Sequence, residues 1–260
     1  MQTLATAMRA GSNEGLALPC PLNLFARHGA YFRRGQVSLI AGASGGGKSA
    51  LGTHIAVHSA PKIPTLYLSA DCDKITMGTR IASGILNINI EDAEYRLREG
   101  DEDAWKSLES ETNHIWFYWD SQPLLSDLDE EVHAYAYVTG AWPHLIVVDN
   151  LINIDPEGEA SHVQKDSVMH HLQGLATYTN AHVMVLHHVT GQYEDGLMPI
   201  PKSGLLDKVA KRPRLVVTLY RSAENLLGVC IVKNSTGQAA ADGSYGFDLA
   251  WRPERCYLRG

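Results

Sequence analysis

The sequence predicts an α/β fold in which a mostly parallel sheet is flanked by helices and ends in an antiparallel C-terminal edge. Three observations predict this fold. Apolar strand candidates alternate with helix-like segments over most of the chain, a pattern typical of parallel sheets covered on both faces. A glycine-rich loop stands between the first of these strands and a helix candidate. From Leu215 onward, strand candidates follow one another across short polar turns, as in an antiparallel edge.

Length and charge are consistent with one large domain. A chain of 260 residues can bury a sizeable core. We expect residues 1–18, a mixture of small and polar residues, to form a flexible N-terminal arm, and residues 19–260 to form the domain. The net charge of −7 argues against a protein coated in positive potential. It does not exclude nucleic acid, because a ring or filament can concentrate a few cations in one channel.

The sequence has no marks of a membrane or secreted protein. No apolar run reaches the roughly 18 residues that span a bilayer, and the first residues lack a signal-peptide pattern. The four cysteines are scattered, which indicates neither a disulfide framework nor a zinc site. His54 and His58 are spaced for one helix face, and we expect a structural role for them. A cytoplasmic location without membrane contact is expected.

The elements can be placed in chain order. Parallel strands are expected at 36–41, 65–70, 115–118, 145–148 and 183–186, and antiparallel strands at 215–220, 226–232 and 244–251. Helices are expected at 50–57, 75–86, 127–138 and 161–179, the last with Ser161 as a possible N-cap. The acidic stretch 91–111 is interpreted as a solvated helical excursion rather than an acidic binding tail.

The glycine-rich loop has the pattern G-x-x-x-x-G-K-[ST] of nucleoside-triphosphate-binding proteins. Its backbone N–H groups and the following helix N-terminus form an anion site. Lys48 is expected to reach the β- and γ-phosphates of ATP, and the Ser49 hydroxyl to ligate Mg²⁺. The residues predicted to bind the nucleotide here are Gly42, Ala43, Ser44, Gly45, Gly46, Gly47, Lys48, Ser49 and Ala50.

Two acids follow predicted strands. Asp149 ends the strand at 145–148, where a carboxylate can hold the hydration shell of Mg²⁺. Asp71 ends the strand at 65–70 and is placed to activate the attacking water. The alternative for Asp71 is a helix N-cap, for which Asp73 is the better candidate.

Three further features are less specific. His188, after the strand at 183–186, is a candidate sensor of the γ-phosphate, slightly ahead of His187. The basic loop 189–214 is either a site for DNA phosphates or an ordinary surface loop. Its predicted DNA-binding residues are Lys202, Lys208, Lys211 and Arg212. Lys233 is a candidate for contacting a neighbouring subunit's γ-phosphate, or belongs to a polar hairpin turn.

Together these motifs resemble the RecA-like ATPase core of DnaB-type and RepA-type hexameric helicases and of KaiC/RadA-like ATPases, over about residues 22–258. The double histidine is similar to the RepA-type sensor. The resemblance implies ATP and Mg²⁺ as ligands, with Arg221 among the nucleotide-site residues. Two positions depart from the family: Asp71 replaces its catalytic glutamate, and Ser235 replaces its finger arginine, for which Lys233 or Arg221 could substitute. The family's N-terminal collar has no counterpart here, as expected for a compact ATPase of the kind phages encode.

The resemblance implies a homo-oligomeric ring, expected to be a hexamer, that hydrolyses ATP at its subunit interfaces. The first hypothesis is therefore a helicase or translocase acting on single-stranded DNA in replication or recombination. The second is a slow RecA/KaiC/RadA-like ATP switch or recombination mediator, which the departures at Asp71 and Ser235 favour. A small-molecule kinase would need a cationic lid, and the strand-rich last third of the chain does not look like one.

Overall fold

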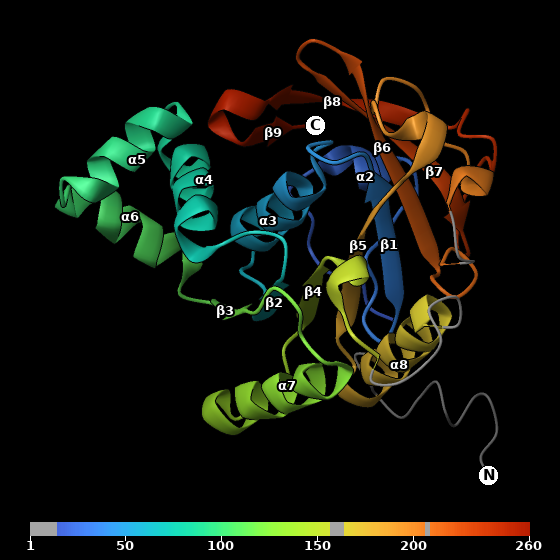
Figure 1. The fold of residues 1–260 in the computed structure, drawn as a ribbon, viewed down its shortest axis with the longest axis horizontal. Helices are drawn as coiled ribbons and strands as arrows, with labels where there is room; N and C mark the ends of the chain where they lie inside the picture. The colour runs from blue at the N-terminus through green and yellow to red at the C-terminus, as the bar shows by residue number, and fades with distance from the viewer. Residues whose placement is uncertain (1–14, 157–163, 206–208) are drawn as a thin grey trace.

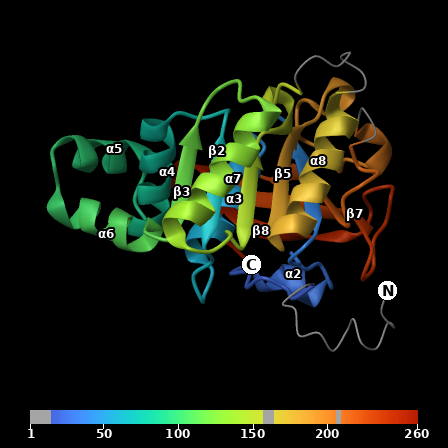
Figure 2. The same ribbon diagram turned by 90° about the horizontal axis from the view of Figure 1, so that it is seen from below.

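The computed structural model describes residues 15–156, 164–205 and 209–260. Its strands form a single nine-stranded sheet in the order β3-β2-β4-β5-β1-β6-β7-β8-β9, shown in Figures 1 and 2. The pairs from β3 to β6 are parallel and those from β6 to β9 are antiparallel. The strands are β1 (Val37–Gly42), β2 (Thr65–Ser69), β3 (Ile115–Trp119), β4 (Leu145–Asp149), β5 (His182–His188), β6 (Leu215–Ala223), β7 (Leu226–Asn234), β8 (Gly246–Arg252) and β9 (Tyr257–Arg259). The predicted fold class is confirmed.

Helices cover both faces of the sheet. On one face lie α7 (Leu125–Thr139) and α8 (Gln164–Thr179), and on the other lie α2 (Asn23–Arg27), α3 (Lys48–His58) and α4 (Lys74–Leu86). Helices α5 (Ile90–Arg98) and α6 (Glu102–Thr112) pack against α4 and extend away from the sheet (Figure 1). Short 3₁₀ turns are η1 (Leu151–Asn153), η2 (Gly191–Tyr193), η3 (Lys202–Gly204) and η4 (Pro253–Arg255). Among the described helices, none has the length and apolarity to cross a membrane.

The sheet core follows from the alternation of side chains along each strand. On β4, Ile146 and Val148 face the α7–α8 layer, whereas Leu145 and Val147 face α3. All five residues of β4 are buried, which explains why these strands are continuous apolar runs in the sequence. The site described below therefore rests on the most thoroughly buried strands of the protein.

Local signals account for the starts of α4 and α6. The Asp73 carboxylate accepts hydrogen bonds from the backbone N–H groups of Ile75 and Thr76, so Asp73 caps α4 as the sequence indicates. The predicted excursion at 91–111 is helical but consists of two helices, because the chain turns at Gly100 and Asp101 caps α6. Ser161 and residues 1–14 lie outside the described residues. Gly15 to Leu18 hydrogen-bond to residues 32–34.

The parallel registers bring four strand ends to one edge of the sheet. Ser69 of β2 pairs with Asp149 of β4, and Gly42 of β1 pairs with His188 of β5. The chain segments that follow β1, β2, β4 and β5 therefore begin side by side. In open parallel sheets, ligands bind at this carboxyl edge.

Candidate nucleotide-binding site

The loop between β1 and α3 has the backbone that a phosphate-binding loop needs. Gly47 adopts φ +84°, a left-handed conformation that favours glycine. A Cβ on Gly46 would lie 2.9 Å from the carbonyl oxygen of Ala43, closer than such contacts allow. The loop from Ser44 to Ala50 lines a cavity of about 510 Å³. That volume is within the usual range for small-molecule and cofactor sites.

Lys48 is buried at the start of α3, and its ammonium group faces the loop. Nζ donates to the carbonyl oxygens of Gly42 at 3.1 Å and Ala43 at 2.7 Å. Burial lowers the pKa of Lys48 to about 8, against the opposing effect of the Asp149 and Asp71 carboxylates. An anion in the cavity would favour the charged ammonium, because it would compensate for the lost hydration.

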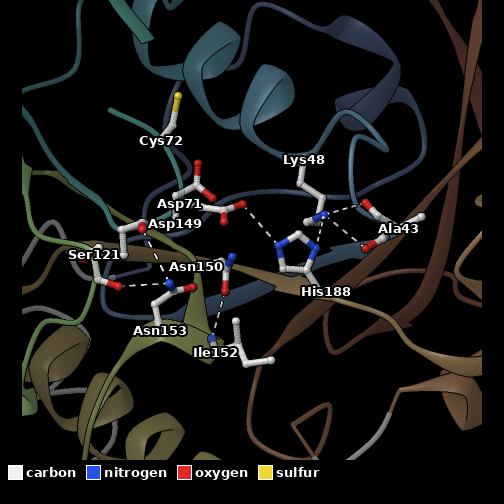
Figure 3. Close-up of polar contacts among 12 residues, drawn as sticks. Ala43, Lys48, Asp71, Cys72, Ser121, Asp149, Asn150, Ile152, Asn153 and His188 are labelled. Carbon is white, nitrogen blue, oxygen red and sulfur yellow. Dashed lines mark hydrogen bonds and ion pairs between the residues drawn. The ribbon is translucent and has the colours of Figure 1, made fainter. Parts of the chain in front are cut away.

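His188 connects Lys48 to Asp71, as Figure 3 shows. Its Nδ1 lies 3.1 Å from Lys48 Nζ, and its Nε2 lies 3.2 Å from Asp71 Oδ2. A neutral imidazole that accepts at Nδ1 and donates at Nε2 satisfies both neighbours. Two histidines follow one another at the end of β5, but His187 is buried and His188 lines the cavity.

Asp149 ends β4 in a buried position beside the loop. Its Oδ2 accepts a 2.8 Å hydrogen bond from the Tyr67 hydroxyl, while the buried Oδ1 has no hydrogen-bond partner among the described residues. Burial raises the pKa of Asp149, and the Ser49 and Tyr67 hydroxyls act in the opposite direction. A carboxylate oxygen without a partner, close to a hydroxyl, fits the oxygen ligands that Mg²⁺ prefers. The peptide bond from Asp149 to Asn150 is cis.

The two acids after β2 have different surroundings. Asp73 is committed to capping α4, whereas the Asp71 carboxylate is partly exposed, lines the cavity and contacts His188. The backbone N–H groups of Ala70 and Asp71 both point to the Asp149 carbonyl oxygen, at 2.6 and 3.3 Å. These bonds tie the segment carrying Asp71 to the end of β4. Lys48, His188 and Asp71 thus form one connected group that lines the cavity, and the buried Asp149 adjoins it through the backbone contact with Asp71.

Comparisons with known proteins agree with this geometry. Residues 17–192 match a family model described as an AAA domain (AAA_25). The chain belongs to the AAA domain family. It is 33% identical over 251 residues to the Gene 65 protein of Mycobacterium phage L5, covering 94% of this chain and 92% of that protein. It is 32% identical over 213 residues to the Gene 65 protein of Mycobacterium phage D29, covering 79% and 91%.

Solved structures confirm the RecA-like fold of this AAA domain. One solved ATPase domain matches with a TM-score of 0.79 at 15% identity, over 99% of this chain and 95% of that one. A DnaB-like replicative helicase, solved with its interactions with primase, matches with a TM-score of 0.78 at 15% identity. That match covers 98% of this chain and 66% of the helicase chain. The resemblance to the ATPase core of DnaB-type helicases is therefore confirmed at the level of the fold.

The far wall of the cavity in this AAA domain comes from elements that no sequence motif connects with the site. Trp251 on β8, Arg80 on α4 and Cys256 all line the cavity. The Arg221 guanidinium on β6 lies over the Trp251 ring, 5.5 Å from its centroid. Arg221, predicted from the resemblance, is thus next to the cavity through Trp251. No local sequence signal marks Trp251, because it is one of several apolar residues in a strand.

Lys233 and the described cations of the basic loop are not among the residues that line this cavity, although the loop begins at the phosphate-binding loop, where the Val189 N–H donates to the Gly42 carbonyl oxygen. Lys233 Nζ donates to the carbonyl oxygens of Ala210 and Lys211 at 3.1 and 2.7 Å, and Lys233 does not line the cavity. Burial lowers the pKa of Lys233, as do the nearby cations of Lys202 and Arg214. These side chains therefore form a local concentration of positive charge.

Another residue of the basic loop is tied to a helix of the AAA domain. The Arg212 guanidinium donates two hydrogen bonds, of 2.9 and 2.8 Å, to the Asp166 carboxylate on α8. Such a paired arginine holds the loop against α8 and has fewer donors left for another anion. Lys208 lies outside the described residues. His54 and His58 lie on α3, where their rings contact each other at 4.6 Å.

Proposed function

We propose that this protein is an Mg²⁺-dependent ATPase that assembles into a ring, in the simplest case a hexamer, and acts on single-stranded DNA as a helicase or translocase. One observation carries the ATPase part: Lys48, Asp71 and His188 come from three different segments and meet at one cavity beside a phosphate-binding loop, with Asp149 buried next to Asp71. Neighbouring carboxylates, an ammonium group and an imidazole at a loop of this kind suit phosphoryl transfer to water.

Each side chain has a role that its contacts support. Lys48 holds the β- and γ-phosphates in place of its present carbonyl and imidazole partners. Asp71, the more exposed of the two carboxylates, orients the attacking water and accepts its proton. Ser49 and Asp149 hold Mg²⁺, which when bound neutralises charge developing on the phosphate oxygens. When the γ-phosphate is bound, His188 contacts it instead of Lys48. Because His188 also contacts Asp71, this change transmits the presence of the γ-phosphate to Asp71.

The nucleobase is proposed to lie against the wall formed by Trp251. An aromatic ring with a guanidinium over it offers a flat, polarisable surface, and a purine can stack on either group. The cavity extends from the loop to Trp251 and Pro253. A triphosphate held by the loop therefore directs its base toward β8, away from the catalytic carboxylates.

The DNA contacts are proposed for the basic loop. Lys202, Lys208 and Lys211 supply charge for phosphates, and Arg212 contributes chiefly by fixing the loop on α8. Changing Lys202 and Lys211 together to Ala should weaken single-stranded DNA binding. The slope of log affinity against log salt concentration should become less steep by about 0.7 for each phosphate that is no longer neutralised. Lys62→Ala is the control, because Lys62 pairs with Glu111 and is remote from the loop in sequence. Unchanged affinity at low salt would exclude this loop as the DNA site.

A slow ATP switch is the second candidate. It is favoured by the contact of Asp71 with His188, which engages the proposed water-activating carboxylate. It is also favoured by Lys233, whose ammonium group is bonded to carbonyls of its own chain, and by Ser235 in place of an arginine. A switch would bind DNA or a partner in its ATP state without fast turnover.

The test measures ATP hydrolysis with and without single-stranded DNA, on protein whose mass in solution is determined with ATP and Mg²⁺. A ring-sized assembly with DNA-stimulated turnover supports the motor. Slow turnover that DNA does not alter supports the switch. Lys48→Ala should abolish both binding and turnover in either case, and unchanged binding by that variant contradicts the nucleotide site itself.

A further inference from the structure

Tyr67 is a buried tyrosine that the proposed chemistry does not yet use. It is the middle residue of β2, its side chain has no exposed surface, and its ring packs against Phe117 at 5.4 Å between centroids. A buried tyrosine hydroxyl usually finds a hydrogen-bond partner. The Tyr67 hydroxyl donates a 2.8 Å hydrogen bond to Oδ2 of Asp149, a residue of the proposed Mg²⁺ site.

The register explains how the hydroxyl reaches this carboxylate. Tyr67 pairs with Val147 on β4, and Asp149 is two residues further along the same face. Such diagonal neighbours are within reach of a long aromatic side chain. The hydroxyl lies beneath α3, where a Cβ on Gly52 would be only 3.7 Å from it. The interaction is therefore enclosed between the sheet and the helix that begins with Lys48 and Ser49.

We propose that Tyr67 is a positioning residue, whose hydroxyl holds the Asp149 carboxylate so that the opposite oxygen, Oδ1, stays available to a hydrated divalent cation. This inference rests on the proposed Mg²⁺-nucleotide site. Asp149 is buried, and Oδ1 has no hydrogen-bond partner among the described residues. One oxygen is thus fixed by the protein and the other is left for a ligand. Partners of this kind orient metal-binding carboxylates and tune their basicity.

The experiment compares the wild type with Tyr67→Phe, which keeps the ring and removes only the hydroxyl. Tyr118→Phe is the matched control, because Tyr118 lies on the neighbouring strand β3 and its hydroxyl contacts Asp120. Mn²⁺ binding is measured by electron paramagnetic resonance with saturating ADP at neutral pH. The carbon-13 chemical shift of the Asp149 carboxyl is also recorded in nucleotide-free protein at the same pH, with Asp149→Asn used for assignment.

For Tyr67→Phe we expect about tenfold weaker Mn²⁺ binding and a changed chemical shift of the Asp149 carboxyl. Tyr118→Phe should match the wild type in both. Mn²⁺ binding by Tyr67→Phe that equals the wild type, even with a lower melting temperature, would overturn the inference and leave a packing role. If the wild type binds no ADP, the proposed function fails, and the chemical shift in nucleotide-free protein still decides whether Tyr67 holds the Asp149 carboxylate.

Discussion

The Nδ1 atom of His188 lies 3.1 Å from the Lys48 ammonium nitrogen, so the lysine of the phosphate-binding loop has an imidazole as a hydrogen-bond partner. Two carbonyl oxygens of the loop complete its contacts. A phosphate that binds must therefore replace existing hydrogen bonds rather than meet a free cation. Because Nε2 of the same imidazole contacts Asp71, a phosphate that displaces His188 from Lys48 also alters the contact of His188 with Asp71.

Nucleotide affinity should depend on pH through Lys48. Burial lowers the pKa of Lys48 to about 8, and a bound phosphate favours the ammonium form. Below pH 8 Lys48 is already protonated and affinity is at its maximum. Above pH 8 binding must take up a proton, so the affinity should fall by about tenfold per pH unit. The affinity for ADP, measured without Mg²⁺ at several pH values from 6.5 to 9.5, tests this prediction. An affinity that does not change with pH would contradict it.

His188→Ala should separate binding from turnover. The variant frees Lys48 from one competing partner, so ADP should bind at least as tightly as in the wild type. Asp71 loses the same neighbour, and stimulation of hydrolysis by DNA should disappear. His133→Ala is the control, because His133 is an exposed residue of α7. Persistent DNA stimulation in His188→Ala would show that His188 does not transmit the state of the nucleotide.

The variants Asp71→Asn and Asp73→Asn test whether the first acid after β2 acts in catalysis and the second only caps α4. Asp71→Asn should lower turnover by about 10²- to 10⁴-fold if the carboxylate acts as general base, with ATP binding retained. Asp73→Asn keeps a residue suited to capping α4, so it should alter neither turnover nor stability strongly. Steady-state hydrolysis and thermal melting of both variants measure the difference. Equal turnover in the two variants would show that the Asp71 carboxylate is not the general base.

Arg221→Ala should weaken ATP binding but leave tripolyphosphate binding unchanged. The guanidinium contributes through the Trp251 ring, and cation–π contacts provide about 0.5–2 kcal/mol, equivalent to roughly a 2- to 30-fold change in affinity. Tripolyphosphate lacks the base and should not respond. Arg252→Ala serves as the control, because Arg252 follows Trp251 in the sequence and its side chain is exposed. Calorimetric titration with both ligands would settle this, and equal losses for the two would indicate a general charge effect.

The sequence predicts those parts of the protein that depend on short-range patterns. The phosphate-binding loop follows a buried strand, Asp149 and His188 each end one, and parallel strands bring these ends together whatever the details of packing. The cap at Asp73 is equally local. The sheet order from β3 to β8 could not be derived in the same way, because pairing depends on contacts between distant segments.

Other features required the folded chain. The hydrogen bond from Tyr67 to Asp149 spans 82 positions, and the contact of Arg221 with Trp251 joins β6 and β8, two strands that are separated by β7 in the sheet. Strand β9 is three residues long and follows a left-handed residue at Cys256, too short for a periodic signal. The partners of Lys233 are backbone carbonyls, which any sequence offers.

The position of Trp251 gives the protein an internal optical probe. The chain has five tryptophans. Trp105, Trp116 and Trp119 are substantially exposed, whereas Trp251 is buried and lines the cavity. An indole shielded from water emits at shorter wavelength than exposed ones, and a stacked purine would quench it. Intrinsic fluorescence could therefore follow occupancy of the cavity in real time without a labelled nucleotide.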